Sequence, residues 1–89
     1  MAQFLKPIFT PSFNKQYKKL SIKLQRKFTK QLEYLVKNYR HPSLRAKKME
    51  SVNKFEARIN RHNRFTFQIE DNQIILRNIG PHDTGLGKK

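Results

Sequence analysis

The chain has 89 residues, which allows one small domain, and its hydrophobic share of 36% supports a single modest core. Twenty Lys and Arg against six Asp and Glu give a formal net charge of +14, so a polyanion is the expected partner, nucleic acid first and an acidic protein second. The absence of cysteine excludes disulfides, thiolate chemistry and sulfur-based zinc sites, and the histidines are too scattered for a metal site. No run is apolar and long enough for a secretory signal or a bilayer span, so we expect a cytosolic protein that needs neither metal nor cofactor.

The N-terminal half predicts one short strand and then helical structure. Gln3 to Phe9 is an apolar stretch carrying Pro7, which a strand tolerates at a sheet edge or at its end. Thr10-Pro11 is typical of an N-cap followed by proline at the first helical position. Apolar residues then recur in steps of three and four, at Phe13, Tyr17, Leu20, Leu24, Phe28, Leu32 and Leu35. Ser21 is a second candidate cap, so we favour two helices over one bent helix, ending near Asn38.

Basic residues dominate the rest of this half. The lysines and arginines between the apolar helix positions fit an ordinary solvated face that keeps the protein soluble. The helical period is lost between Tyr39 and Ser51, where His41-Pro42-Ser43 is followed by Arg45, Lys47 and Lys48. We interpret this segment as a basic connecting loop.

The C-terminal half predicts three strands. From Lys54 the period drops to two, with Phe55, Ala57 and Ile59 on one face and Glu56, Arg58 and Asn60 on the other. A turn at 61–63 leads to a second alternating strand, in which Phe65, Phe67 and Ile69 point inward and Arg64, Thr66 and Gln68 outward. Asp71-Asn72 occupies a two-residue hairpin position, and Ile74 to Ile79 is apolar on both faces, as expected inside a sheet.

These elements predict one α+β domain over residues 1–83 with the order β-α-α-β-β-β. The two helices pack on one face of a small antiparallel sheet, and residues 84–89 form a flexible basic tail. The outward-pointing side chains of the second and third strands collect on the opposite face of the sheet.

Two features of that open face and its rim are candidates for chemistry. Arg58 and Arg64 flank one turn and are neighbours across the hairpin, so a phosphate between them would satisfy both, unless Glu56 and other acidic groups pair with them as a surface network. His82 follows the last strand, where it is either a proton donor beside that phosphate or a polar loop residue. His41 and His62 are better explained as turn residues.

Six short segments also occur in an order known from one family: Tyr17-Lys-Lys-Leu, His41-Pro-Ser-Leu-Arg, Lys47-Lys-Met, Phe55-Glu-Ala-Arg-Ile, Asn63-Arg-Phe-Thr-Phe and Ile79-Gly-Pro-His-Asp. Over nearly its full length the chain resembles the RelE/ParE-type toxins of type II toxin-antitoxin systems. The resemblance implies two helices packed on an antiparallel sheet and a neighbouring acidic antitoxin that wraps the toxin. Operator DNA would be bound only indirectly, through that antitoxin.

Members of the family differ in their target. The RelE, YoeB and YafQ-like branch cleaves messenger RNA in the ribosomal A site, whereas the ParE branch poisons DNA gyrase. The resemblance to the first branch implies metal-free attack of a ribose 2′-hydroxyl on its own 3′-phosphate, with the ribosome and messenger RNA as partners. The alternatives are a ParE-like gyrase poison and a catalytically weak protein that only binds nucleic acid or its antitoxin.

The resemblance also suggests roles for individual residues. Arg64 matches the arginine that contacts the scissile phosphate, and His82 matches the general acid. The candidate base is Glu56 or a lysine of the basic loop, and Arg58 falls on a further basic site position. The residues that would bind RNA are Arg45, Lys47, Lys48, Arg61 and Leu86. Leu86 departs from the pattern, because many relatives have an aromatic residue there that stacks on a base.

Overall fold

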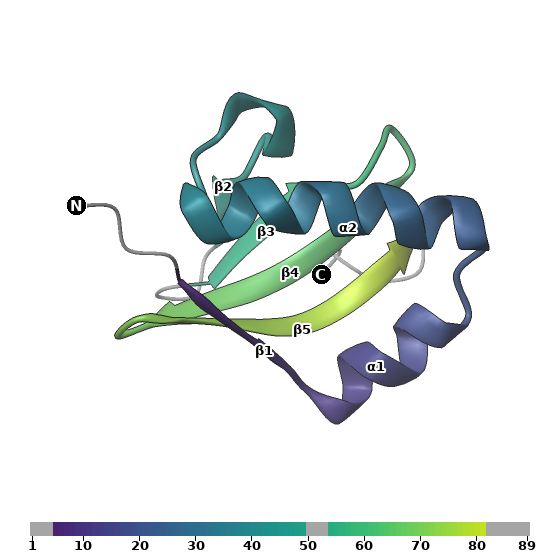
Figure 1. Cartoon of the computed structure of the whole chain (residues 1–89), viewed down its shortest axis with the longest axis horizontal. Helices are drawn as coiled ribbons and strands as arrows, with labels where there is room; N and C mark the ends of the chain where they lie inside the picture. The colour runs from purple at the N-terminus through teal and green to yellow at the C-terminus, as the bar shows by residue number, and fades with distance from the viewer. Residues whose placement is uncertain (1–4, 50–53, 82–89) are drawn as a thin grey trace.

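A computed structural model describes residues 5–49 and 54–81, which form two helices and a five-stranded sheet (Figure 1). In chain order the elements are β1 (Lys6–Phe9), α1 (Pro11–Lys18), α2 (Ile22–Lys37), the 3₁₀ turn η1 (Pro42–Leu44), β2 (Lys47–Lys48), β3 (Lys54–Arg58), β4 (Asn63–Glu70) and β5 (Gln73–Pro81). The spatial order of the strands is β1-β5-β4-β3-β2. The predicted α+β class, with two helices packed on a sheet, is confirmed.

The sheet is mixed, whereas the sequence predicted an antiparallel one. Neighbours from β2 to β5 pair antiparallel, but β1 pairs parallel to β5, with Lys6 opposite Gln73 and Phe9 opposite Leu76. Parallel neighbours need a long connection, and here everything from α1 to β4 separates the two strands in sequence. Alternation within a strand carries no information about the direction of its neighbour, which explains the error.

Side-chain caps divide the helical segment as predicted. Thr10 Oγ1 accepts a hydrogen bond from the backbone N–H of Phe13 at 3.2 Å, and Pro11 is the first helical residue. Ser21 Oγ accepts from Leu24 N, also at 3.2 Å, and begins the second helix. That helix ends with Asn38 as its C-cap, so the prediction of two helices is confirmed.

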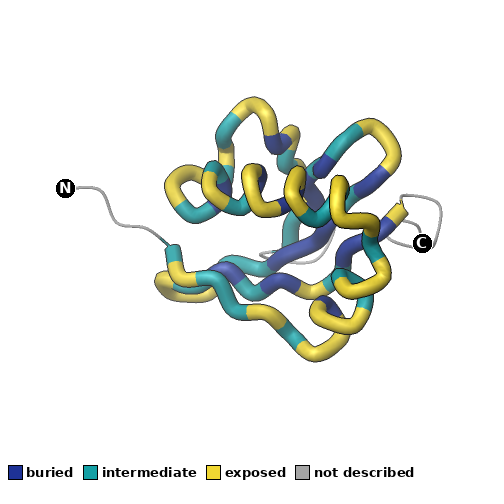
Figure 2. The backbone as a smooth tube through the Cα atoms, turned by 45° about the vertical axis from the view of Figure 1, so that its right-hand side comes forward, coloured by how far each residue is buried: buried dark blue, intermediate teal, exposed yellow. Residues whose placement is uncertain are grey.

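The apolar helix stripe meets the inner face of the sheet in one core. Phe28 of α2 packs edge-on against Phe65 of β4, with ring centroids 5.1 Å apart, and it also contacts Phe13 of α1 at 5.4 Å. Figure 2 shows the buried stretches along the central strands, with the exposed stretches on the outer turns of the helices and in the loops. The buried apolar residues are Phe13, Phe28, Leu35, Leu44, Ala57, Ile59, Phe65, Phe67, Ile74, Leu76 and Ile79.

An irregularity in the pairing of β4 with β5 keeps the apolar side chains inside. Thr66 is opposite Asn78 and Phe67 is opposite Leu76, so Arg77 is an extra residue on β5. Leu76 and Ile79 are therefore both buried although they are three positions apart. As predicted, β5 lies inside the sheet, and Asp71 in the turn before it has a positive φ of 54°.

Hydrogen bonds to α1 and its cap continue the sheet where β1 stops. Thr10 Oγ1 donates to the carbonyl oxygen of Leu76 at 2.8 Å, and Thr10 N donates to the same oxygen at 3.2 Å. Farther along β5 the N–H of Ile79 donates to Gln16 Oε1 at 2.9 Å. A glutamine side chain thus satisfies a backbone donor that no strand reaches.

The basic segment after α2 is more ordered than the predicted loop. It contains η1 and the short strand β2, in which Lys47 is opposite Glu56 and Lys48 is opposite Phe55. Between them Arg45 takes the left-handed conformation, with φ 48°. None of the helices in the described ranges is long and apolar enough to cross a membrane.

Candidate active site

A pocket of about 270 Å³ opens between the basic segment and the β3–β4 hairpin. Its lining residues are Arg45, Lys47, Glu56, Ala57, Arg58 and Arg64. Five of these six are charged, and five of the nine residues proposed from the sequence as site residues are brought together here.

Strand register explains why these side chains meet. Arg58 lies directly opposite Arg64, and Glu56 lies between Lys47 on one side and Thr66 on the other. Residues opposite each other in a sheet point to the same face. The alternation that buries Ala57, Phe65 and Phe67 against the helices therefore directs these charged groups to the other face.

Arg64 is held by the turn that precedes it. Its Nη1 donates to the carbonyl oxygens of Asn60 at 3.1 Å and Arg61 at 2.9 Å. The turn is itself fixed by Asn60 Oδ1, which accepts from the backbone N–H groups of His62 and Asn63, both at 2.9 Å. Within the described part of the chain the remaining donors of Arg64 have no partner, so an oriented guanidinium faces the pocket with hydrogen bonds to give.

Glu56 is the most unusual group in the pocket. The residue is only 5% exposed, and its Oε2 is buried without a hydrogen-bond partner among the described residues. A buried acceptor left unpaired is costly, and native structures leave few of them outside sites that bind something. Glu56 therefore carries an acceptor that no described group uses, on a residue that lines the pocket.

The surface network that was the alternative explanation for these charges does not form among the residues that the structure describes. No ion pair joins any two residues of the ranges 5–49 and 54–81, although four cationic side chains line the same pocket as Glu56. Thr66, expected on an open face, is buried as well, at 3% exposure, and Asn78 Nδ2 donates to its Oγ1 at 3.4 Å. An excess of cationic over acidic side chains among the described lining residues favours an anion in a concave site, and planar guanidinium groups suit phosphate.

Two of the predicted site residues, Lys48 and Arg61, are described and do not line the pocket, and two others are not described. Lys48 is exposed and, as the neighbour of Lys47 on β2, points to the other face of the sheet. Arg61 is exposed in the turn and contributes its carbonyl oxygen to Arg64 rather than its charge to the pocket. His82 and Leu86 lie outside the described residues, as do residues 84–89 of the predicted tail.

The other histidines occupy turns, as predicted. His41 caps η1 by accepting a hydrogen bond from Ser43 N at 3.1 Å, and its ring stacks on Tyr34 with centroids 4.0 Å apart. His62 is exposed in the β3–β4 turn. In the parts of the chain that the structure describes, no group of three or more His, Asp or Glu residues is placed to hold a metal ion.

Gln31, near this site, was missed in the sequence. Its side-chain amide lies between η1 and β3 and is only 8% exposed. The signal was present, because Phe28, Gln31 and Leu35 follow the helical spacing of a buried stripe. A glutamine inside such a stripe indicates that a buried backbone group needs a hydrogen bond.

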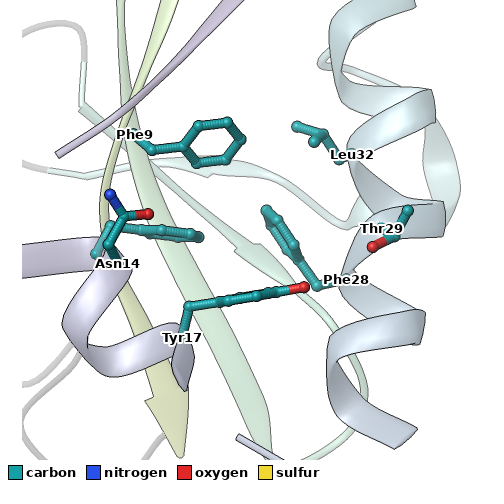
Figure 3. Close-up of a pocket in the computed structure, with 7 residues that line it drawn as sticks. Phe9, Asn14, Tyr17, Phe28, Thr29 and Leu32 are labelled. Atoms are coloured by element: carbon teal, nitrogen blue, oxygen red, sulfur yellow. The ribbon is translucent and has the colours of Figure 1, made fainter. Parts of the chain in front are cut away.

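A second hollow, of about 290 Å³, has a different character. Figure 3 shows Phe9, Tyr17, Phe28 and Leu32 pointing toward one another between the end of β1 and the two helices. Its polar lining consists of Asn14, Thr29 and the Tyr17 hydroxyl, with no charged group. This apolar groove has no charged group for a phosphate, whereas the charged pocket brings together five of the residues proposed from the sequence and is the candidate active site.

Comparison with known proteins gives a clear result for the fold. No protein-family model matches the sequence, and no curated protein matches it. Among solved structures, the archaeal RelE in the RelE-RelB complex of Pyrococcus horikoshii is 15% identical with a TM-score of 0.78, covering 92% of this chain and 99% of that one. The YoeB/ParE toxin of Agrobacterium tumefaciens is 12% identical with a TM-score of 0.77, covering 88% and 99%.

The same fold occurs in the YoeB-YefM complex of Staphylococcus aureus, with 22% identity, a TM-score of 0.74, and coverage of 90% of this chain and 99% of that one. The chain therefore has the fold of the RelE, YoeB and ParE toxins over most of its length.

Proposed function

We propose that this protein is the toxin of a toxin-antitoxin pair and acts as a ribosome-dependent endoribonuclease. The observation that carries the proposal is the charged pocket, in which the buried and unpaired carboxylate oxygen of Glu56 lies among lysine and arginine side chains. Cleavage of RNA by its own 2′-hydroxyl needs a base and preorganised positive charge at the phosphate, and this pocket offers both.

The chemistry follows from the groups present. Glu56 Oε2 accepts the proton of the ribose 2′-hydroxyl, whose oxygen attacks the adjacent phosphorus. Arg58 and Arg64 stabilise the charge that develops on the phosphoryl oxygens, and no metal is required for this. The bond to the 5′-oxygen breaks, which leaves a 2′,3′-cyclic phosphate and a 5′-hydroxyl. DNA lacks the 2′-hydroxyl and is not cut.

His82 is the proposed acid that protonates the leaving 5′-oxygen. It directly follows Pro81, which ends β5 and is opposite Asn63, the residue before Arg64. The end of β5 thus lies beside the strand that carries Arg64. Lys47 and Arg45 bind the neighbouring RNA phosphates, so the affinity of the protein for RNA falls as salt rises.

The protein partner we propose is a small acidic antitoxin. The solved YoeB and RelE relatives cited above were captured in complexes with YefM and RelB. In this chain the net charge of +14 makes an acidic partner the complementary one.

Primer extension on messenger RNA bound to translating ribosomes tests the proposal. The wild-type protein should cut within A-site codons, while Glu56→Gln and His82→Ala should each slow cleavage by about 10²–10⁴-fold, the range for a lost general base or acid. Glu33→Gln, which changes an exposed carboxylate on α2, is the matched control and should cleave like wild type.

Intact RNA with a folded wild-type protein would contradict the nuclease proposal. Gyrase-dependent DNA breaks in that case would identify the ParE-like activity instead. Cleavage that survives in Glu56→Gln would show that another group is the base.

A further inference from the structure

We infer that Gln31 is a positioning residue that sets the width of the candidate active site by holding its two walls together. One wall is the segment from η1 through Arg45 to Lys47, and the other is β3 with Arg58. The inference rests on the proposed function for its activity readout, but the geometry is independent of it.

The amide of Gln31 makes three hydrogen bonds to the two walls, with both of its N–H donors and with its oxygen. Its Nε2 donates to the carbonyl oxygen of Arg58 at 2.8 Å and to that of Ser43 at 3.0 Å. Its Oε1 accepts from Ser43 Oγ at 3.1 Å. Gln31 is only 8% exposed and the three bonds are partly buried, so removal of the amide leaves partly buried carbonyl groups without this donor.

The bridge occupies the place where the sheet ladder fails. Lys47 is opposite Glu56, so continuing the antiparallel register by two residues would bring Arg45 opposite Arg58. That pairing does not form, because Arg45 has a positive φ of 48° and β2 begins only at Lys47. Gln31 reaches across from α2 and supplies the hydrogen bond to Arg58 that a strand neighbour would otherwise make.

The failed ladder is also what opens the pocket. If β2 continued, Arg45 and Arg58 would be held at the spacing of adjacent strands, which leaves no room for a phosphate between their backbones. The left-handed residue separates the walls, and the amide fixes how far apart they stay. Because both Arg45 and Arg58 line the pocket, a change at Gln31 displaces two phosphate-binding groups at once without touching the ligand.

The chain contains a matched control on the same helix. Gln25 Nε2 donates to the carbonyl oxygens of Tyr17 at 3.1 Å and Leu20 at 3.3 Å, so it joins α2 to α1 by the same chemistry. It is not among the residues that line the charged pocket. Gln25→Leu therefore removes a comparable amide bridge without altering the walls of the site.

The test is a double-mutant cycle on cleavage of ribosome-bound messenger RNA. Gln31→Leu should lower kcat by about 10–100-fold, the size of effect that a displacement of about 1 Å has on a catalytic group. KM should change little, because the rest of the basic surface holds the ribosome. In the Arg58→Ala background Gln31→Leu should cost little more, because much of its effect passes through Arg58. Gln25→Leu should leave kcat at the wild-type value.

The inference would be overturned if Gln31→Leu lowered kcat by the same factor in the wild-type and Arg58→Ala backgrounds. It would also be overturned if Gln25→Leu lowered kcat as much as Gln31→Leu does. Thermal unfolding of each variant identifies effects that come from lost folding.

If the wild-type protein cleaves no RNA, the proposed function fails and the inference is judged on binding. The same proteins are titrated with a short RNA that carries 2′-O-methyl groups, which occupies the pocket but cannot react. Gln31→Leu should weaken binding and should be non-additive with Arg58→Ala. Equal affinities for Gln31→Leu and Gln25→Leu would show that Gln31 does not position the site.

Discussion

Thr10 makes two kinds of contact at the start of α1, and replacing it by alanine measures both. Its Oγ1 accepts from Phe13 N at 3.2 Å as the helix cap and donates to the Leu76 carbonyl of β5 at 2.8 Å. Loss of a threonine cap costs about 1 kcal/mol. Loss of the second bond adds about 0.5–1 kcal/mol. The second cost is at the low end because Thr10 N still donates to the same carbonyl, at 3.2 Å.

The free energy of unfolding of Thr10→Ala should therefore fall by about 1.5–2 kcal/mol. In a domain of this size each kcal/mol lowers Tm by about 4–8 °C, so we expect a decrease of roughly 6–16 °C. Urea titration and thermal unfolding by circular dichroism both measure it.

Ser21→Ala is the matched control. Ser21 caps α2 with the same 3.2 Å bond, in an exposed position and without a bond to the sheet. It should cost about 0.5–1 kcal/mol. If the two variants lose equal stability, the bond from Thr10 to β5 contributes nothing and the reasoning is refuted.

Two further predictions concern the backbone and the charge of the pocket. Arg45→Gly removes the strain of a left-handed non-glycine residue and should raise the free energy of unfolding by about 0.5–1 kcal/mol while weakening RNA binding. Asp71→Gly, at φ 54° in the β4–β5 turn, should give a similar stabilisation with unchanged RNA binding. A loss of stability in either variant would contradict this reasoning. Binding of a short single-stranded RNA should weaken as salt rises, and Lys47→Ala should reduce the slope of log K against log salt by about 0.7, which corresponds to one phosphate contact. The control Lys18→Ala, on α1, should leave the slope unchanged. Equal slopes for wild type and Lys47→Ala would show that Lys47 does not bind RNA.

Local signals in the sequence were sufficient for the helices and the hairpins. The caps at Thr10 and Ser21, the period-two strands and the Asp71 turn each depend on residues close together in the chain, and each was predicted. The parallel pairing of β1 with β5 was missed because it joins segments more than sixty residues apart, such as Lys6 and Gln73. Periodicity describes the faces of a strand and not its neighbours.

The candidate site divides in the same way. Arg58 and Arg64 were placed together because a hairpin register can be counted in the sequence. Lys48 points away from the pocket because of the way β2 pairs with β3. This strand has only two residues, and its sequence signal is too short to detect. The burial of Glu56 comes from side chains on several elements, so no local pattern indicated that its carboxylate would be 5% exposed and unpaired.

The hydrogen bond from Ile79 N to Gln16 Oε1 has a consequence for how other molecules approach the sheet. An open strand edge is a template onto which another chain can add a strand, and this is a common route both to complexes and to aggregation. Here the donor beyond the end of β1 is already occupied, and Pro7 removes another N–H from β1 itself. These two features reduce the number of backbone donors that this edge offers to an added strand, whereas the apolar groove beside Phe9 offers side chains to a protein that binds this side of the domain.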